Sequence, residues 1–166
     1  NMEQIVVSGA ALKKDLIRVS LRGVPDHPGI SATIFSRIAQ ANIMVDDIIQ
    51  TIDVDKTANV SFTVEHGDLA DIKPVVEALV KQLGGERTVA RFDADLAKVS
   101  VVGVGMRSHT GVAHRMFEAL ANAKINIENI TTSEIKISVM IKKDDGPKAL
   151  KLVHDAFELG AAAGTP

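Results

Sequence analysis

The chain contains two copies of one sequence unit, and this repeat limits its fold more than any other feature does. The stretch "LIRVSLRGV" at 16–24 corresponds to "LAKVSVVGV" at 96–104, 80 residues later. The next loop is "PDHPG" in the first copy and the longer "GMRSHTG" in the second, after which positions 29–48 correspond to 111–130. A chain of 166 residues could form one ordinary domain or two domains of about 80 residues. Because an internal repeat settles such a choice, we predict two domains of the same fold.

The first copy follows an order of strand and helix patterns that indicates a fold class. Apolar and polar residues alternate over 17–22, as in a strand with one buried face. After it come a helical stripe over 30–41, hairpin strands over 44–52 and 59–65, a second helical stripe over 69–83 and a last strand over 87–93. This order predicts an α+β, ferredoxin-like βαββαβ unit, whose antiparallel four-stranded sheet carries both helices on one face.

The second copy repeats this order but lacks its last strand. Its patterns are a strand over 99–104, a helix carrying Val112 to Leu120, a hairpin over 125–142 and a helix from Gly146. The tail at 158–166 has neither the alternation nor the branched residues of a strand. An extra strand pattern lies at 5–7, and we predict that it completes the second unit. The predicted domains are therefore 16–94, inserted into a second domain made of 3–9 and 96–160.

The composition excludes several classes of function. Scattered basic residues, 19 against 21 acidic ones, give no electrostatic basis for nucleic-acid binding. The absence of cysteine excludes disulfides, thiolate catalysis and cysteine metal sites. No stretch approaches the roughly 18 apolar residues of a membrane span, and no secretory signal pattern precedes the first strand. We therefore expect a cytoplasmic protein with no membrane or nucleic-acid partner.

No catalytic or metal-binding constellation is evident. Gly103 and Gly105 follow a strand as in a dinucleotide fingerprint, but the third glycine is replaced by Ser108. The five histidines lack the spacing of metal ligands and are interpreted as surface or loop residues. Asp53 and Asp55 lie in a hairpin turn, which carboxylates commonly stabilise. We expect no catalytic residues, no metal and no cofactor in this chain.

The two strand-to-helix loops are the remaining candidates for function. A helix N-terminus presents unpaired N–H groups and partial positive charge, which suit a carboxylate. Gly29 and Gly111 would let a ligand approach the backbone closely, and Asp26 offers an anion for an ammonium group. Together these features suit an α-amino acid. The alternative is that Asp26 caps the helix and the glycines only form the turn.

Three motifs occur together and in order: "GVPDHPG" at 23–29, "GVGMRSHTGV" at 103–112 and "TSEIKISV" at 132–139. In these motifs the chain resembles the tandem ACT domains at the C-terminus of bacterial aspartate kinase, over residues 3–160. The resemblance implies an allosteric regulatory part that binds threonine, lysine or both at interfaces between ACT domains. Binding would then cause feedback inhibition of lysine, threonine and methionine biosynthesis.

The same resemblance implies two ligand sites. The first would use Asp26, Pro28, Gly29, Ile30, Ser31 and Gln50, completed by Asn126 and Ile127 of the paired domain. The second would use Ser108, His109, Thr110, Gly111 and Val112, with Met44 and Val45 opposite. Met44 replaces the asparagine of the other copy, and the second loop has no acid matching Asp26, so the second site is expected to be weaker, differently selective or empty.

The resemblance also implies partners. The family's kinase signature, Lys-Phe-Gly-Gly, is absent, so ATP and Mg²⁺ are expected only in a kinase domain that this chain lacks. The implied partners are a second copy, in a homodimer, and an aspartate kinase catalytic domain or subunit. The chain would be either a separate regulatory subunit or a regulatory region of a longer protein. Two alternatives are an ACT-type regulator of another enzyme or of transcription, and a ferredoxin-like enzyme.

Overall fold

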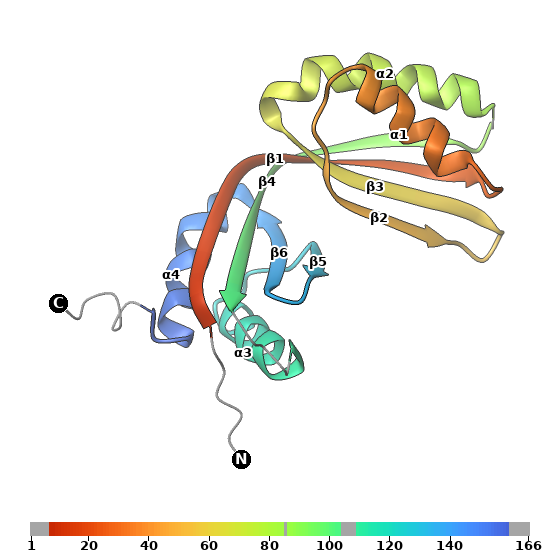
Figure 1. The fold of residues 1–166 in the computed structure, drawn as a ribbon. Helices are drawn as coiled ribbons and strands as arrows, with labels where there is room; N and C mark the ends of the chain where they lie inside the picture. The colour runs from red at the N-terminus through yellow and green to blue at the C-terminus, as the bar shows by residue number, and fades with distance from the viewer. Residues whose placement is uncertain (1–6, 85, 104–108, 160–166) are drawn as a thin grey trace. The chain divides into compact units, whose positions relative to one another are not determined.

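The structure is a computed structural model that describes residues 7–84, 86–103 and 109–159. It divides into two compact units, which are described separately here. One unit is Asp15–Ala94, named the inserted unit, and the other joins Asn1–Lys14 to Asp95–Pro166, named the split unit. Two long strands, β1 (Val7–Pro25) and β4 (Val89–Gly103), contribute residues to both units (Figure 1). Each unit is ferredoxin-like, with the first inserted into the second, so the predicted fold class is confirmed.

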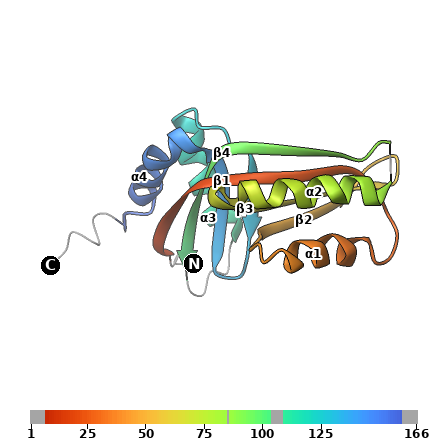
Figure 2. The ribbon, with the colours of Figure 1, turned by 90° about the horizontal axis from the view of Figure 1, so that it is seen from above.

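The inserted unit has the strand order β2-β3-β1-β4. Both of its helices lie on the same face of this sheet (Figures 1 and 2). Besides its parts of β1 and β4, it contains α1 (Ile30–Gln40), β2 (Asp46–Ile52), β3 (Thr57–Glu65), a short 3-10 turn (His66–Asp68) and α2 (Leu69–Leu83). Gly84 ends α2 in the left-handed conformation that glycine commonly adopts at the end of a helix.

The core of the inserted unit lies between its sheet and its two helices. Val19 pairs with Phe62 and Leu21 with Val60, which directs alternate side chains of β1 and β3 toward the helices. All four are at most 1% exposed. The Phe62 ring meets Phe35 of α1 edge to face, with centroids 5.8 Å apart. The predicted inward face of 17–22 and 59–65 is therefore confirmed.

The split unit repeats the arrangement with the strand order β1-β4-β6-β5. After β4 it contains α3 (His109–Asn122), β5 (Asn129–Thr132), β6 (Lys136–Lys142), a short 3-10 turn (Lys143–Asp145) and α4 (Gly146–Ala156). Its core includes Val99, Val101, Met116, Ile137 and Val139, all fully buried. None of the helices in the described part of the chain is both long and apolar enough to cross a membrane.

The N-terminal strand differs from its predicted position. The sequence places it at 5–7, of which only Val7 lies inside the described residues. In the structure the segment beside β4 runs from Val7 to Lys14 without a break into the rest of β1, and the Ser8 hydroxyl donates to the Val102 carbonyl over 3.2 Å. The sequence predicts a strand here but misses its extension to Lys14, because the glycine, alanines and paired lysines of 9–14 have low β-propensity, which pairing with β4 overrides.

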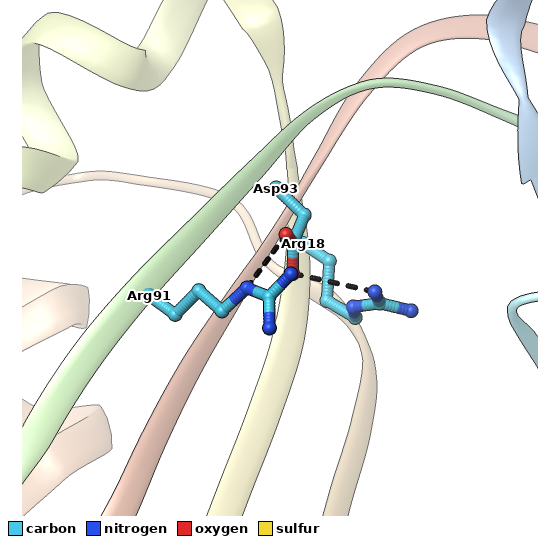
Figure 3. A network of polar contacts seen from close by, with 3 residues as sticks. All are labelled: Arg18, Arg91 and Asp93. Atoms are coloured by element: carbon cyan, nitrogen blue, oxygen red, sulfur yellow. Dashed lines mark hydrogen bonds and ion pairs between the residues drawn. The ribbon is translucent and has the colours of Figure 1, made fainter.

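A small ion-pair network joins β1 to β4 inside the inserted unit (Figure 3). The Asp93 carboxylate accepts from the Arg18 guanidinium at 3.3 Å and from the Arg91 guanidinium at 2.9 Å. The side chains of Arg18 and Asp93 are about four-fifths buried, whereas Arg91 is 70% exposed. Water screens such exposed charges, so the Arg18 contact is the more stabilising of the two.

The β2–β3 turn uses its carboxylates as the sequence predicts. Asp53 accepts from the Val54 N–H at 2.8 Å, and Asp55 accepts from the hydroxyl of Thr57 at 2.6 Å and from its N–H at 3.0 Å. The Thr57 hydroxyl, followed by the Thr57 N–H, lowers the pKa of Asp55 below its ordinary value of 3.8. Both donors favour the ionised carboxylate.

A pH dependence follows from this turn. Because folding depresses the pKa of Asp55, its contribution to stability is present above pH 3.8 and is lost as the pH falls further. Asp55→Ala should therefore lower the urea midpoint most at neutral pH, and the difference from wild type should shrink toward about pH 2. Urea unfolding at a series of pH values measures this difference. A difference that stays constant across the series would contradict the assigned role of the carboxylate.

Candidate functional site

A cleft of about 470 Å³ opens in the inserted unit where β1 leads into α1. It is formed by the loop after β1, by the first turn of α1 and by one residue of the edge strand β2. The lining residues are Asp26, His27, Pro28, Gly29, Ile30, Ser31, Ala32 and Gln50. These residues bring a carboxylate, a helix N-terminus and a side-chain amide together in one hollow.

Gly29 shapes the floor of this cleft. Its φ of 92° is a left-handed conformation that glycine adopts without steric cost, and a Cβ built there would meet nothing within 4 Å. The Gly29 carbonyl accepts from the N–H of Thr33 at 3.0 Å and from its hydroxyl at 3.1 Å. The space beside the Gly29 Cα, at the start of α1, is therefore open.

The first turn of α1 offers donors to an anion. Gly29 is the N-cap of α1, no side chain caps the helix, and its first turn contains no acid. The alternative prediction, that Asp26 caps this helix, is therefore wrong. Ile30 donates its N–H to the His27 carbonyl at 3.2 Å. At a helix N-terminus the next amides have no intrahelical acceptor, and with the helix dipole they attract a carboxylate.

Gln50 reaches this helix end from the edge strand. It lies opposite Val60, on the face of the sheet that carries the helices. Its Oε1 accepts a hydrogen bond from the Ser31 hydroxyl on α1. Since an amide group carries two N–H donors and one acceptor oxygen, this contact turns the NH₂ group of Gln50 away from Ser31 and leaves it to donate to a ligand.

The structure brings together all the first-site residues that belong to the inserted unit. Asp26, Pro28, Gly29, Ile30, Ser31 and Gln50 each line the cleft. Sequence reasoning missed two lining residues, His27 and Ala32. His27 was interpreted as a loop histidine, and it does lie exposed in the loop, where its Nδ1 donates to the Pro28 carbonyl at 3.1 Å. Its position between Asp26 and Pro28 was the signal that could have placed it in the site.

The other predicted residues lie elsewhere. Asn126, exposed, and Ile127, half-buried, belong to the split unit and precede β5. Of the predicted second site, Ser108 lies outside the described residues and His109 to Val112 form the start of α3. Val112 is 1% exposed and packs in the core, so only its backbone could meet a ligand. Met44 is 85% exposed, whereas Val45 packs against the core of the inserted unit.

The described residues hold no group of three or more histidine, aspartate or glutamate side chains suited to a metal ion. The cleft itself presents several polar groups to a ligand. One carboxylate, one amide NH₂, one hydroxyl and a helix N-terminus can bind a zwitterion, with the ammonium near Asp26 and the carboxylate near the helix.

Comparison with known proteins identifies the family of this chain. ACT-domain family models match residues 18–84 and residues 99–157. The regulatory subunit of aspartate kinase from Thermus flavus is 38% identical, with a TM-score of 0.82 over 92% of this chain and 99% of that one. The chain belongs to the ACT-domain regulatory regions of aspartate kinase.

Other aspartate kinases match this regulatory region along its whole length. An aspartate kinase from Stutzerimonas stutzeri is 45% identical over 164 residues, which cover 99% of this chain. The aspartate kinase structure from Synechocystis is 40% identical, with a TM-score of 0.86, and 28% of that chain is covered. The regulatory region spans 39% of the length of the Stutzerimonas protein, so the comparison concerns only part of a complete kinase.

Proposed function

We propose that this regulatory region binds threonine, lysine or both in the cleft at the start of α1, and that binding inhibits an aspartate kinase catalytic domain or subunit. The observation that carries the proposal is the joint placement of Asp26, the N-terminus of α1 and Gln50 around one hollow. An α-amino acid has an ammonium group that can pair with Asp26 and a carboxylate that can bind at the N-terminus of α1. Gln50 would then meet the side chain or the carboxylate of the ligand.

The ligand-binding site would be completed by a second ACT domain. Asn126 and Ile127, at the equivalent strand start of the split unit, are the residues proposed to close the cleft of a paired domain. The edge strand β2 supports such pairing, because Ile48 and Ile52 on it are each 54% exposed and unpaired strand edges tend to be covered. A homodimer in the cytoplasm is the proposed assembly.

Inhibition would follow if the ligand binds one relative arrangement of the paired ACT domains more tightly than another. A ligand that contacts two domains favours whichever arrangement binds it more tightly. Coupling free energies of about 1–3 kcal/mol are usual for such effects and change activity by roughly 5- to 150-fold. The predicted second site, at the start of α3, is proposed to bind more weakly or with different selectivity because its loop lacks an acid matching Asp26.

Isothermal titration calorimetry tests this proposal. Threonine and lysine are titrated separately and then together, and at least one of them is expected to bind with measurable heat. Valine serves as the matched control for threonine, because it has the same shape without the hydroxyl group and should bind more weakly by about tenfold. If neither threonine nor lysine binds at millimolar concentration, the proposal is wrong.

A further inference from the structure

The edge strand β2 contains a bulge that changes its register against β3. Asp46 pairs with Thr63, whereas Ile49 pairs with Ser61 and Gln50 with Val60. Three steps along β2 therefore correspond to two steps along β3, so β2 carries one extra residue between Asp46 and Ile49. An extra residue of this kind reverses the face on which all later side chains of the strand lie.

The bulge decides on which face Gln50 lies. Thr63 and Ser61 lie on the face of β3 opposite the helices, whereas Val60 and Phe62 belong to the core beneath the helices. Without the extra residue, Gln50 would lie opposite Asn59, on the helix-free face. With it, Gln50 lies opposite Val60, beside the first turn of α1, where it contacts Ser31.

Two residues hold the bulge, Asp47 through its backbone conformation and Thr63 through its hydroxyl group. Asp47 has a φ of 50°, a left-handed conformation that aspartate tolerates better than most residues and that β-branched residues rarely adopt. The Thr63 hydroxyl, in a side chain 3% exposed, donates to the Asp46 carbonyl at 3.1 Å and lies 3.3 Å from Asp47 Oδ2. This hydroxyl therefore contacts both residues at the start of the bulge.

The split unit has an extra residue at the corresponding place but lacks the hydroxyl contact. There, Asn129 pairs with Met140, and the Glu128 N–H also donates to the Met140 carbonyl at 2.7 Å, so two residues again face one. Met140 occupies the place of Thr63 but has no hydroxyl group, and Thr132, opposite Ile137, occupies the place of Gln50. The hydroxyl contact is thus found in the copy that carries the cleft.

We infer that Thr63 and Asp47 are positioning residues of the cleft: they hold the β2 bulge and thereby turn Gln50 toward α1. Neither residue lines the cleft, so their effect on a ligand would pass through Gln50. The consequence for ligand affinity rests on the proposed function. The consequence for the orientation of Gln50 does not depend on any ligand.

The ligand-free chain provides the first test. Nuclear Overhauser contacts between the γ-protons of Gln50 and the β-protons of Ser31 are expected in the wild type, because the two side chains are hydrogen-bonded. They should disappear in Thr63→Val, which keeps the shape and loses the hydroxyl, and persist in Thr63→Ser. Asp47→Val, which disfavours the left-handed conformation, should also remove them, whereas Asp47→Gly should retain them. Contacts that persist in both valine variants would overturn the inference.

Calorimetry with threonine and lysine provides the second test, by a double-mutant cycle. Thr63→Val is expected to weaken binding by roughly five- to twentyfold, the scale of one lost hydrogen bond to the ligand. In a Gln50→Ala background, Thr63→Val should change affinity by less than about twofold, because residues that act through one another are not additive. Equal losses in both backgrounds would show that Thr63 does not act through Gln50.

The two ideas can fail separately. If the wild-type chain binds neither amino acid, the proposed function is wrong, while the magnetic resonance contacts still decide whether Thr63 and Asp47 orient Gln50. If the chain binds threonine or lysine normally in the Thr63→Val and Asp47→Val variants, the proposed function stands and the positioning role is wrong.

Discussion

Replacing Asp26 with alanine is expected to weaken threonine or lysine binding by about 10- to 150-fold, as for the loss of a charged hydrogen bond. The residue lies exposed in the loop before α1, lines the cleft and does not cap the helix. Its carboxylate is therefore available to the ammonium group of a ligand. Calorimetric titration of the variant with each amino acid measures the loss.

A control must separate the general effect of losing one negative charge from the specific effect of losing the Asp26 carboxylate in the cleft. Asp71→Ala removes the same charge from an exposed site in the first turn of α2, in the same unit, and is expected to leave affinity within about twofold. Asp26→Asn keeps the shape of the side chain and should lose most of the affinity, because a neutral amide attracts an ammonium group weakly. Full affinity in Asp26→Ala would remove Asp26 from the site.

The sequence predicts the architecture well because the repeat and the alternation of apolar residues are strong signals. Residues 17–22 and 59–65 alternate cleanly, and their apolar members form the core beneath the helices. The sequence also singles out the loop before α1, because polar residues and glycines at a strand-to-helix junction do not serve a hydrophobic core. The residues of the inserted unit that were predicted for this site line one cleft.

Other features depend on tertiary pairing and leave no local signal. The continuous course of β1 through Gly9 to Lys14 follows from its partner β4, since these residues have low intrinsic strand preference. The face on which Gln50 lies depends on one extra residue in β2, which alternation alone cannot reveal. Gly29 and not Asp26 is the N-cap of α1, and the left-handed conformation of Gly29 is a property of the folded loop that the sequence alone does not give.

The repeat is visible in the backbone as well as in the sequence. Asp15 and Asp95, 80 residues apart, have φ values of 59° and 60°, and Asn42 and Lys124, 82 residues apart, have φ values of 57° and 61°. These spacings equal the two offsets between the sequence copies. Both units therefore share these two irregular backbone positions, although their strand-to-helix loops differ in length and charge.

Replacing Gly23 with alanine is expected to lower the free energy of unfolding by about 2–4 kcal/mol. Gly23 lies at a register shift between β1 and β3, with a φ of 69°. A Cβ at this position would lie 2.3 Å from the Arg87 carbonyl oxygen, which belongs to the backbone and cannot rotate aside. The Gly23 carbonyl also accepts from the buried Thr88 hydroxyl at 2.9 Å, so a shift of this loop would break a second contact. Urea unfolding followed by circular dichroism measures the loss.

A second glycine separates the steric clash from the cost of the left-handed conformation. Gly84 has a φ of 72°, close to that of Gly23, but a Cβ there would lie 3.8 Å from its nearest neighbour. Gly84→Ala therefore carries the conformational cost alone, which is about 1 kcal/mol. The difference between the two variants measures what the Arg87 carbonyl contributes. If Gly23→Ala lowers the free energy of unfolding no more than Gly84→Ala does, the backbone at Arg87 must be able to move away from the added methyl group. The close approach of the segments around Gly23 and Arg87 would then not be needed for stability.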